Sequence, residues 1–204
     1  MPLPAPGKRA LAHTRVVTCY GFKREDNLWD IEGRIVDTKP FDFPNKDRGG
    51  TIRADEPLHD MSIRLTIDID LNVIDAEAVI DDSPYNYCKS IATVARQLVG
   101  LQIAPGWTLK SKTAMGANHG CTHLSELLGP VATTAIQTIS SAKWGQTSSS
   151  EQASSRSFID SCHSYQVDSP VVKEHWPDLY REKPTRRLSE NRRSNAENPF
   201  WPII

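Results

Sequence analysis

A strictly alternating segment near the middle of the chain places the strongest constraint on the fold. From Met61 to Ile69 every odd-numbered residue is apolar, and every even-numbered residue is polar or charged. Successive side chains of a β-strand point to opposite faces, so this pattern predicts a strand with one buried side and one solvent-facing side. A sheet with one apolar face is stable only when a second layer covers that face. The rest of the chain must therefore supply further strands and a covering layer.

Further strand patterns lie on both sides of this segment. Residues 14–24 and Leu28–Val36 are rich in β-branched and aromatic residues, and Lys23–Asn27 between them has the composition of a hairpin turn. Val73–Asp81 follows the turn Asp70–Asn72 and is expected to return antiparallel to the alternating strand. Together these segments predict an antiparallel β-meander of about four strands.

Two other segments have the periodicity of amphipathic helices. Apolar residues in Ile91–Leu98 recur at i, i+3, i+4 and i+7, in a predicted helix that starts near Ser83-Pro84 and stops at Gly100. Those in Cys121–Ser141 form a longer apolar stripe. We expect these two main helices to pack on one face of the meander, which gives an α+β fold. Between them Trp107–Thr113 has the composition of a short strand, and Pro40–Pro57 has the Asp, Asn, Gly and Pro content of a surface loop.

Composition along the chain predicts one domain with flexible ends. Residues 1–13 are expected to be a flexible N-terminus, and residues 14–177 a single α+β domain. A Ser-rich stretch at about 142–157 predicts a linker or an insertion. The valines of Phe158–Val172 can add a strand or a return hairpin, whereas the polar residues 178–204 predict a disordered C-terminal tail.

Charge and hydropathy argue against several classes of partner. Hydrophobic residues make up 38% of the chain, charged residues make up 24%, and the net charge is −1, so nucleic acid is not an expected partner. No export signal and no stretch of roughly 18 apolar residues is present, so we expect a cytoplasmic protein without a membrane span. The four cysteines are then expected to be thiols or metal ligands rather than a disulfide framework.

Candidate chemistry concentrates in the segment His119-Gly-Cys121-Thr-His123. Imidazole and thiolate are the usual ligands of zinc, and thiolates hold iron–sulfur clusters. Because the segment precedes a predicted helix, the positive end of the helix dipole would favour the thiolate form of Cys121. Cys88 opens the first predicted helix in a similar way, and Cys162 offers a third thiol. The predicted metal ligands are therefore Cys88, His119, Cys121, His123 and Cys162, with the thiols of Cys88 and Cys121 expected to lie close together.

Three functions remain open at this point. The first is a metal-binding accessory protein that holds zinc or an iron–sulfur cluster. The second is an enzyme in which Cys121 acts as nucleophile and His119 or His123 acts as base. The third is a non-catalytic protein that docks on a protein partner through its Ser-rich linker and apolar C-terminal end.

No established motif chooses among these three functions. The chain contains no CxxC, HExxH, GxSxG, P-loop or dinucleotide-binding fingerprint. Polar residues near the predicted strand ends are further acid–base or ligand candidates, although such residues are common on strands and loops. They are Asp30, Glu32, His59 and Asp60.

Four sequence segments carry a resemblance to a known family. They are Asp75-Ala-Glu-Ala-Val-Ile with Cys88, Leu98-Val-Gly-Leu, the Gly-Cys-Thr-His-Leu box that begins at Gly120, and Ile159-Asp-Ser-Cys-His. Over roughly residues 10–177 the sequence resembles an uncharacterised bacterial family of unknown-function domains. The resemblance implies that the helix of Cys88, the box and the segment of Cys162 belong to one unit, and it implies no activity.

The order of the cysteines carries a second, more distant resemblance. The sequence is similar to iron–sulfur scaffold proteins of the NifU type, in which a β-meander leads into a helix opened by a cysteine. Here Cys88 and His119-Gly-Cys121 occur in the same order after the predicted strands. The Cys-Gly-Asp turn that carries the first cysteine of the scaffold proteins has no match in this chain.

Overall fold

A computed structural model of the 204-residue chain describes residues 3–144 and 159–182. The chain forms two compact units, residues 1–146 and residues 147–204. The first unit contains the four-stranded sheet, the longest helix and the candidate functional site. The second unit is described separately at the end of this section.

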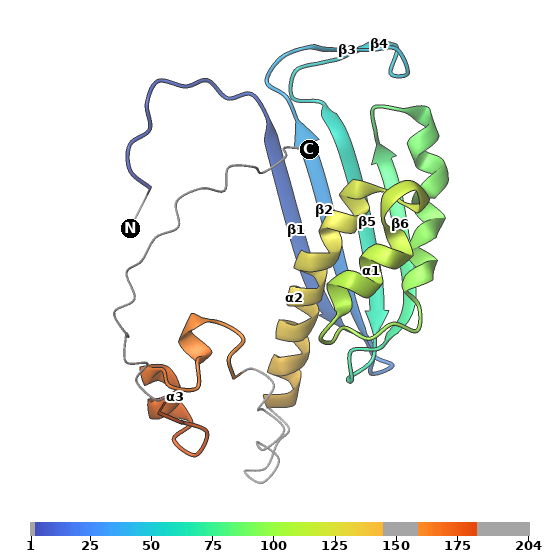
Figure 1. Ribbon diagram of the computed structural model, residues 1–204. Coiled ribbons are helices and arrows are strands. Elements are labelled where there is room, and N and C mark those ends of the chain that lie inside the picture. The colour runs from blue at the N-terminus through green and yellow to red at the C-terminus, as the bar shows by residue number, and fades with distance from the viewer. Residues whose placement is uncertain (1–2, 145–158, 183–204) are drawn as a thin grey trace, which may run out of the picture. The chain divides into compact units, whose positions relative to one another are not determined.

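Four long strands of the first unit form one antiparallel sheet (Figure 1). They are β1 (Thr14–Lys23), β2 (Trp29–Thr38), β5 (Pro57–Ile67) and β6 (Val73–Asp82). Their order in the sheet is β1-β2-β5-β6, which is also their order along the chain, and each strand is antiparallel to its neighbour. The predicted four-stranded meander is therefore confirmed.

The connection between β2 and β5 contains a small hairpin, where the sequence predicts only a surface loop at Pro40–Pro57. Its strands are β3 (Phe43–Asn45) and β4 (Gly50–Ile52). Both glycines of Gly49–Gly50 have positive φ angles, of 74° and 101°, which is the backbone conformation that glycine adopts without strain. Ile52 is buried, and this single apolar anchor is too short a pattern for the sequence to reveal.

Polar contacts attach this hairpin to the far edge of the sheet. Arg48 Nη2 lies 2.9 Å from Asp82 Oδ1 at the end of β6. Asn45 Nδ2 donates a hydrogen bond to the carbonyl oxygen of Pro84, at 2.9 Å. The hairpin thus connects the start of β5 with the segment that leaves β6.

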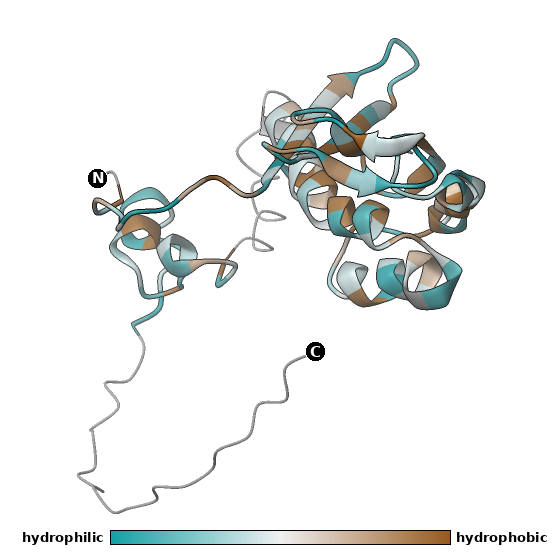
Figure 2. Ribbon diagram, turned by 90° about the horizontal axis from the view of Figure 1, so that it is seen from above, coloured by the Kyte–Doolittle hydropathy of each residue, from teal (hydrophilic) through white to brown (hydrophobic). Residues whose placement is uncertain are grey.

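Helices cover one face of the sheet (Figure 2). They are the 3-10 helix η1 (Asn86–Leu98), α1 (Trp107–Met115) and α2 (Thr122–Trp144). The two helices that the periodicity predicts are η1 and α2, and the α+β class is confirmed. Between the layers lies a core of fully buried side chains, which includes Ile31, Ile63, Leu65, Leu98 and Leu127.

The strand predicted at Trp107–Thr113 is wrong, because this segment forms α1. Its buried residues are Trp107, Ser111 and Met115, which recur at the four-residue spacing of a helix face. The indole Nε1 of Trp107 donates to the carbonyl oxygen of Leu128, at 3.2 Å, and so attaches α1 to α2. Packing of the tryptophan against α2 therefore outweighs the strand preference of the threonines in this segment.

Two glycines allow α2 to lie close against the sheet. A Cβ atom on Gly33 of β2 would lie 2.5 Å from Val131 Cγ2 of α2. A Cβ atom on Gly21 of β1 would lie 2.1 Å from Thr138 Oγ1 of the same helix. Both distances are shorter than real side chains tolerate, so the depth at which α2 packs depends on these two glycines.

Replacing Gly33 by alanine should lower the free energy of unfolding by about 1–3 kcal/mol, because the added methyl group overpacks a close contact. Urea denaturation of Gly33→Ala, Val131→Ala and the double variant measures the effect as a double-mutant cycle. We expect the double variant to lose less stability than the two single losses summed. Strictly additive losses would show that Val131 does not limit the approach of α2.

The second unit is described over residues 159–182 and contains η4 (His163–Tyr165) and α3 (Pro170–His175). The strand predicted within Phe158–Val172 is wrong, because no strand occurs in this described range. Ser169 instead caps α3 by accepting a hydrogen bond from the backbone N–H of Val172, at 3.1 Å. Pro170 follows at the first helical position, where its fixed φ suits a helix start.

The boundary between the two units falls inside the Ser-rich stretch that predicts a linker or insertion at about 142–157. A single domain over residues 14–177 stays a prediction, as do the flexible N-terminus at 1–13 and the disordered tail at 178–204. Most of that tail, residues 183–204, lies outside the described residues. In the described part of the chain, no helix is both long enough and apolar enough to cross a membrane.

Candidate functional site

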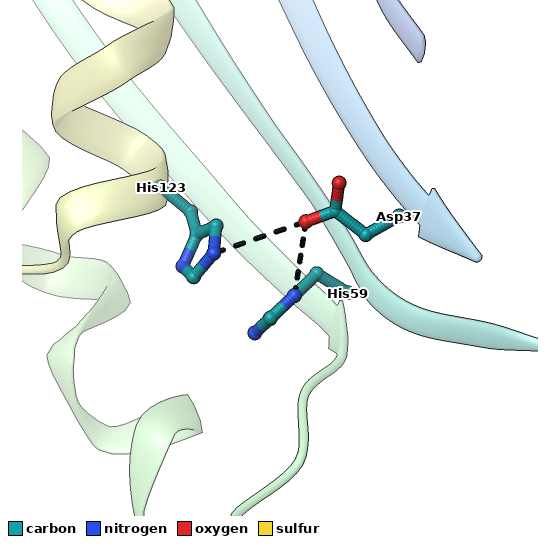
Figure 3. Close-up of side chains that lie close together, drawn as sticks. All are labelled: Asp37, His59 and His123. Carbon is teal, nitrogen blue, oxygen red and sulfur yellow. Dashed lines mark hydrogen bonds and ion pairs between the residues drawn. The ribbon is translucent and has the colours of Figure 1, made fainter. Parts of the chain in front are cut away.

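Three polar side chains stand in a row across one end of the sheet. Arg15 of β1 is directly opposite Asp37 of β2, and Asp37 is directly opposite His59 of β5. Opposite residues of antiparallel strands place their side chains on the same face, which here is the face that the helices cover. His123, at the second position of α2, lies beside Asp37 and His59 (Figure 3).

The carboxylate of Asp37 is buried at the centre of this group. Arg15 donates to both of its oxygens, from Nε to Oδ1 at 2.7 Å and from Nη2 to Oδ2 at 2.8 Å. Nδ1 of His59 lies 3.0 Å from Oδ2, and Nε2 of His13 lies 3.1 Å from Oδ1. Nε2 of His123 is 3.8 Å from Oδ2. One buried carboxylate is thus surrounded by four basic side chains.

These neighbours determine the protonation states of the group. Burial alone would raise the pKa of Asp37, but the hydrogen bonds and charge of Arg15 outweigh it and lower that pKa from 3.8 to about 2. Burial lowers the pKa of His59, and repulsion from His123 lowers it further. Burial also lowers the pKa of His123, with repulsion from Arg15 as the second cause. At pH 7 the carboxylate is therefore ionised and both imidazoles are mainly neutral.

Two further contacts fix the position of His123 relative to the sheet. The rings of His59 and His123 lie with their centroids 3.8 Å apart and their planes tilted by 31°. Arg15 Nη1 donates to Glu126, which follows His123 by one helical turn. The Arg15–Glu126 ion pair therefore connects β1 to the second turn of α2.

Asp37, His59 and His123 could together hold a metal ion. One ligand atom from each lies within 4.8 Å of the ligand atoms of the other two. Two imidazoles and one carboxylate are the protein ligands of many mononuclear zinc and non-haem iron(II) sites. Within the residues that the structure describes, no second group of three or more His, Cys, Asp or Glu side chains comes this close together.

Of the five predicted metal ligands, only His123 belongs to this cluster, and of the further candidates near strand ends only His59 does. Cys121 precedes α2, is half-buried, and has its Sγ 3.8 Å from Sδ of Met61. His119 ends the short 3-10 helix η2 (Ala117–His119) and is exposed. The segment His119–His123 therefore contributes its second histidine to the cluster, whereas its cysteine packs beside a methionine.

The two remaining predicted ligands lie elsewhere in the chain. Cys88 lies in η1 and is half-buried, and Cys162 is an exposed residue of the second unit. Neither thiol is part of a described group of three possible ligands. A site shared by Cys88 and Cys121 stays a prediction.

No sequence motif indicates Asp37 or Arg15. The alternation of buried and exposed residues along β2 and β5 nevertheless places Asp37 and His59 on the buried face. His59 continues the odd-numbered series that begins with Met61, so it belongs to the buried face of β5. Asp37 likewise continues the buried series of β2 after Ile35. A charged or imidazole side chain that continues an apolar face is unusual, and that signal would have identified the site.

The fold and the cluster together define an α+β protein with a carboxylate–imidazole site at one end of an antiparallel sheet. Residues 13–137 match the model of the family described as Protein of unknown function (DUF2889). Since the match covers more than half of the chain, the protein belongs to this family, and the predicted membership of an unknown-function family is confirmed. The matched range includes His13, Asp37, His59 and His123. Similarity to NifU-type scaffold proteins stays a prediction.

Searches of curated proteins and of solved structures gave no match to the chain.

Proposed function

We propose that this protein binds a single zinc ion through Asp37, His59 and His123. The observation that supports the proposal is the convergence of their ligand atoms, within 4.8 Å of one another, from β2, β5 and α2. The protonation states favour binding as well. A metal ion requires an ionised carboxylate and neutral imidazoles, which are the forms that the shifted pKa values give at pH 7.

The contacts around Asp37 leave one of its oxygens facing the imidazoles. Arg15 Nε and His13 Nε2 approach Oδ1, whereas Oδ2 accepts from Arg15 Nη2 at 2.8 Å and also lies 3.0 Å from His59 Nδ1 and 3.8 Å from His123 Nε2. Zinc binds nitrogen and oxygen ligands at about 2.0–2.2 Å, so an ion fits between atoms with such separations. Arg15 and His13 would then orient the ligating carboxylate, as outer hydrogen-bond partners do in known metal sites.

The composition of the cluster favours a mononuclear ion with an open position. Its three ligands include no thiolate, which an iron–sulfur cluster requires. Three protein ligands leave a position for water or substrate, which is typical of catalytic rather than structural zinc. The side chains of His59 and His123 are 13% and 23% exposed, so small molecules can reach them. Zinc bound there would lower the pKa of a coordinated water.

The alternative enzyme, with Cys121 as nucleophile, has weaker support. A nucleophilic thiol needs an imidazole within hydrogen-bond reach to accept its proton. The contact described for the thiol of Cys121 is with Met61, at 3.8 Å, and none of the described hydrogen bonds joins it to a histidine. We therefore place the proposed chemistry at Asp37, His59 and His123.

Protein purified without chelator, and freed of any histidine tag, should contain about one equivalent of zinc by plasma mass spectrometry. His59→Ala and His123→Ala should each weaken zinc binding by at least about 100-fold in calorimetric titrations of the metal-free protein, because each removes a direct ligand. His119→Ala is the matched control, since this exposed histidine lies four residues before His123 and outside the cluster. The zinc affinity of His119→Ala should equal that of the wild type.

Two results would contradict the proposal. One is a protein that binds zinc equally well with and without His59 and His123. The other is zinc that is released on Cys88→Ser or Cys121→Ser and kept in both histidine variants, which would favour the predicted cysteine ligands instead. Iron in place of zinc with the same histidine dependence would change the metal and keep the site.

A further inference from the structure

β1 is an edge strand with properties that favour pairing with another strand. Within the described residues it pairs with β2 alone. It is 10 residues long, and its pairing with β2 has no register shift, whereas the other two pairings of this sheet each contain one or more. A long and regular edge presents a row of backbone donors and acceptors to any strand that approaches it.

The side chains of β1 do not protect this edge. Proteins usually block an edge with charged residues, prolines or bulges. Between Arg15 and Lys23, β1 has none of these. Val16, Tyr20 and Phe22 are exposed instead on the face of the sheet opposite the helices. The uncovered edge therefore offers both backbone hydrogen bonds and a column of apolar side chains.

The neighbouring charges on that face are already paired with one another. Arg64 Nε donates to Glu32 Oε1 at 2.8 Å, and Arg34 Nε donates to Asp60 Oδ1 at 2.7 Å. These ion pairs join β2 to β5 and do not involve β1. The chemistry that fits the edge is therefore a strand with an uncharged and largely apolar central part, which β1 itself provides between Arg15 and Lys23.

We propose that β1 pairs antiparallel with β1 of a second copy, which joins two sheets into one continuous sheet. A two-fold axis perpendicular to the sheet leaves the side chains of each face on that same face in the second copy. Even-numbered residues of β1 can therefore lie opposite only even-numbered residues, and odd-numbered residues opposite only odd-numbered ones. A centre at Thr18 places Val16 opposite Tyr20 of the second copy, a favourable β-branched and aromatic pair. A centre at Cys19 would place Arg15 opposite Lys23, which is a like-charge pair. The charges thus disfavour the register centred on Cys19, and the Val16–Tyr20 pair favours the register centred on Thr18.

The 204-residue chain should be a dimer in sedimentation velocity and light scattering at micromolar concentration. A Val16→Lys/Tyr20→Lys variant places lysines opposite each other in this register, so its dimer affinity should fall by at least about tenfold. Val79→Lys is the matched control, because Val79 is on the same face of β6 and is 52% exposed, against 51% for Val16. Circular dichroism spectra establish that all variants keep the fold.

The register has its own test. Directly opposite residues of antiparallel strands have Cα atoms about 4.5–5.5 Å apart, a distance that a disulfide can span. Thr18→Cys should therefore crosslink two copies under mild oxidation on a non-reducing gel, more than the wild type does, and Phe22→Cys should not. A monomeric wild type, or a dimer insensitive to Val16→Lys/Tyr20→Lys, would overturn the proposal. Crosslinking through Phe22→Cys alone would overturn the register.

Discussion

Replacing Asp37 by asparagine should abolish zinc binding and lower the free energy of unfolding at pH 7 by about 2 kcal/mol. Asparagine keeps the size of the side chain but removes the charge that Arg15 and the histidines surround. The shift of the Asp37 pKa from 3.8 to about 2 means that the folded protein stabilises the charged form by about 2 kcal/mol relative to the neutral form. Urea denaturation and zinc titration measure the two effects separately.

The same residue should control stability in acid. Because its pKa is lower in the folded than in the unfolded state, Asp37 adds stability above about pH 4 and loses it as the pH falls towards 2. The free energy of unfolding of the wild type should therefore fall by about 2 kcal/mol over this range because of Asp37. The Asp37→Asn variant should not show this part of the decrease. Asp81→Asn, at an exposed aspartate of β6, is the control and should follow the wild type. Parallel curves for the wild type and Asp37→Asn would contradict the prediction.

His59 and His123 should also make the protein less stable as the pH falls, but at a higher pH than Asp37. Their pKa values are lowered in the folded state, so their contribution to stability is present above the unfolded pKa of about 6.5 and decreases below it. Protons also compete with zinc for the imidazoles over this range. Stability and zinc affinity should thus begin to decrease as the pH falls below about 6.5, before Asp37 itself titrates.

Replacing Gly120 by alanine should destabilise the protein by about 3 kcal/mol or more. A Cβ atom at this position would lie 1.6 Å from the carbonyl oxygen of Met115 and 2.4 Å from its carbonyl carbon. Both are backbone atoms, so no side-chain rotation relieves the clash, and α1 and α2 must separate. Ser125 Oγ donates to the same carbonyl oxygen, at 3.0 Å, and would lose this bond. Thermal and urea denaturation measure the loss.

Zinc affinity should fall together with stability in Gly120→Ala, because His123 is only three residues further along the chain. Gly129→Ala is the control within the same helix. Nothing lies within 4 Å of a Cβ at Gly129, and alanine is the better helix former, so this variant should gain up to about 1 kcal/mol. A Gly120→Ala protein as stable as the wild type would show that the turn between the helices can adjust.

The elements that the sequence predicts well are those with long periodic patterns. The alternation of Met61–Ile69 and the stripe of Cys121–Ser141 extend over several repeats, and each repeat indicates again which side is buried. Trp107–Thr113 is too short for either period to be clear, and its helix depends on packing of Trp107 against Leu128. Such a contact joins residues far apart in the chain, so local composition does not contain it.

The site could be predicted only in part for the same reason. His123 is indicated by its spacing from Cys121 at the start of a predicted helix. Its partners, Asp37 and His59, are neighbours through strand register, which no local spacing encodes. Residue type alone favoured cysteines and histidines as ligands, whereas the fold brings together a carboxylate and imidazoles.

The hairpin between β2 and β5 is separable from the sheet that it interrupts. Thr38 and Pro57 are already paired across the two strands, so the sheet does not need residues 39–56 in order to close. A short engineered turn could replace that segment and leave Asp37 and His59 on adjoining strands. Such a replacement would remove the buried side chain of Ile52 and the contacts of Arg48 with Asp82 and of Asn45 with Pro84, which lie away from Asp37 and His59 at the opposite edge of the sheet from β1. Insertions or exchanged loops should therefore be tolerated at this position, which makes it a suitable place for attaching a reporter next to the site.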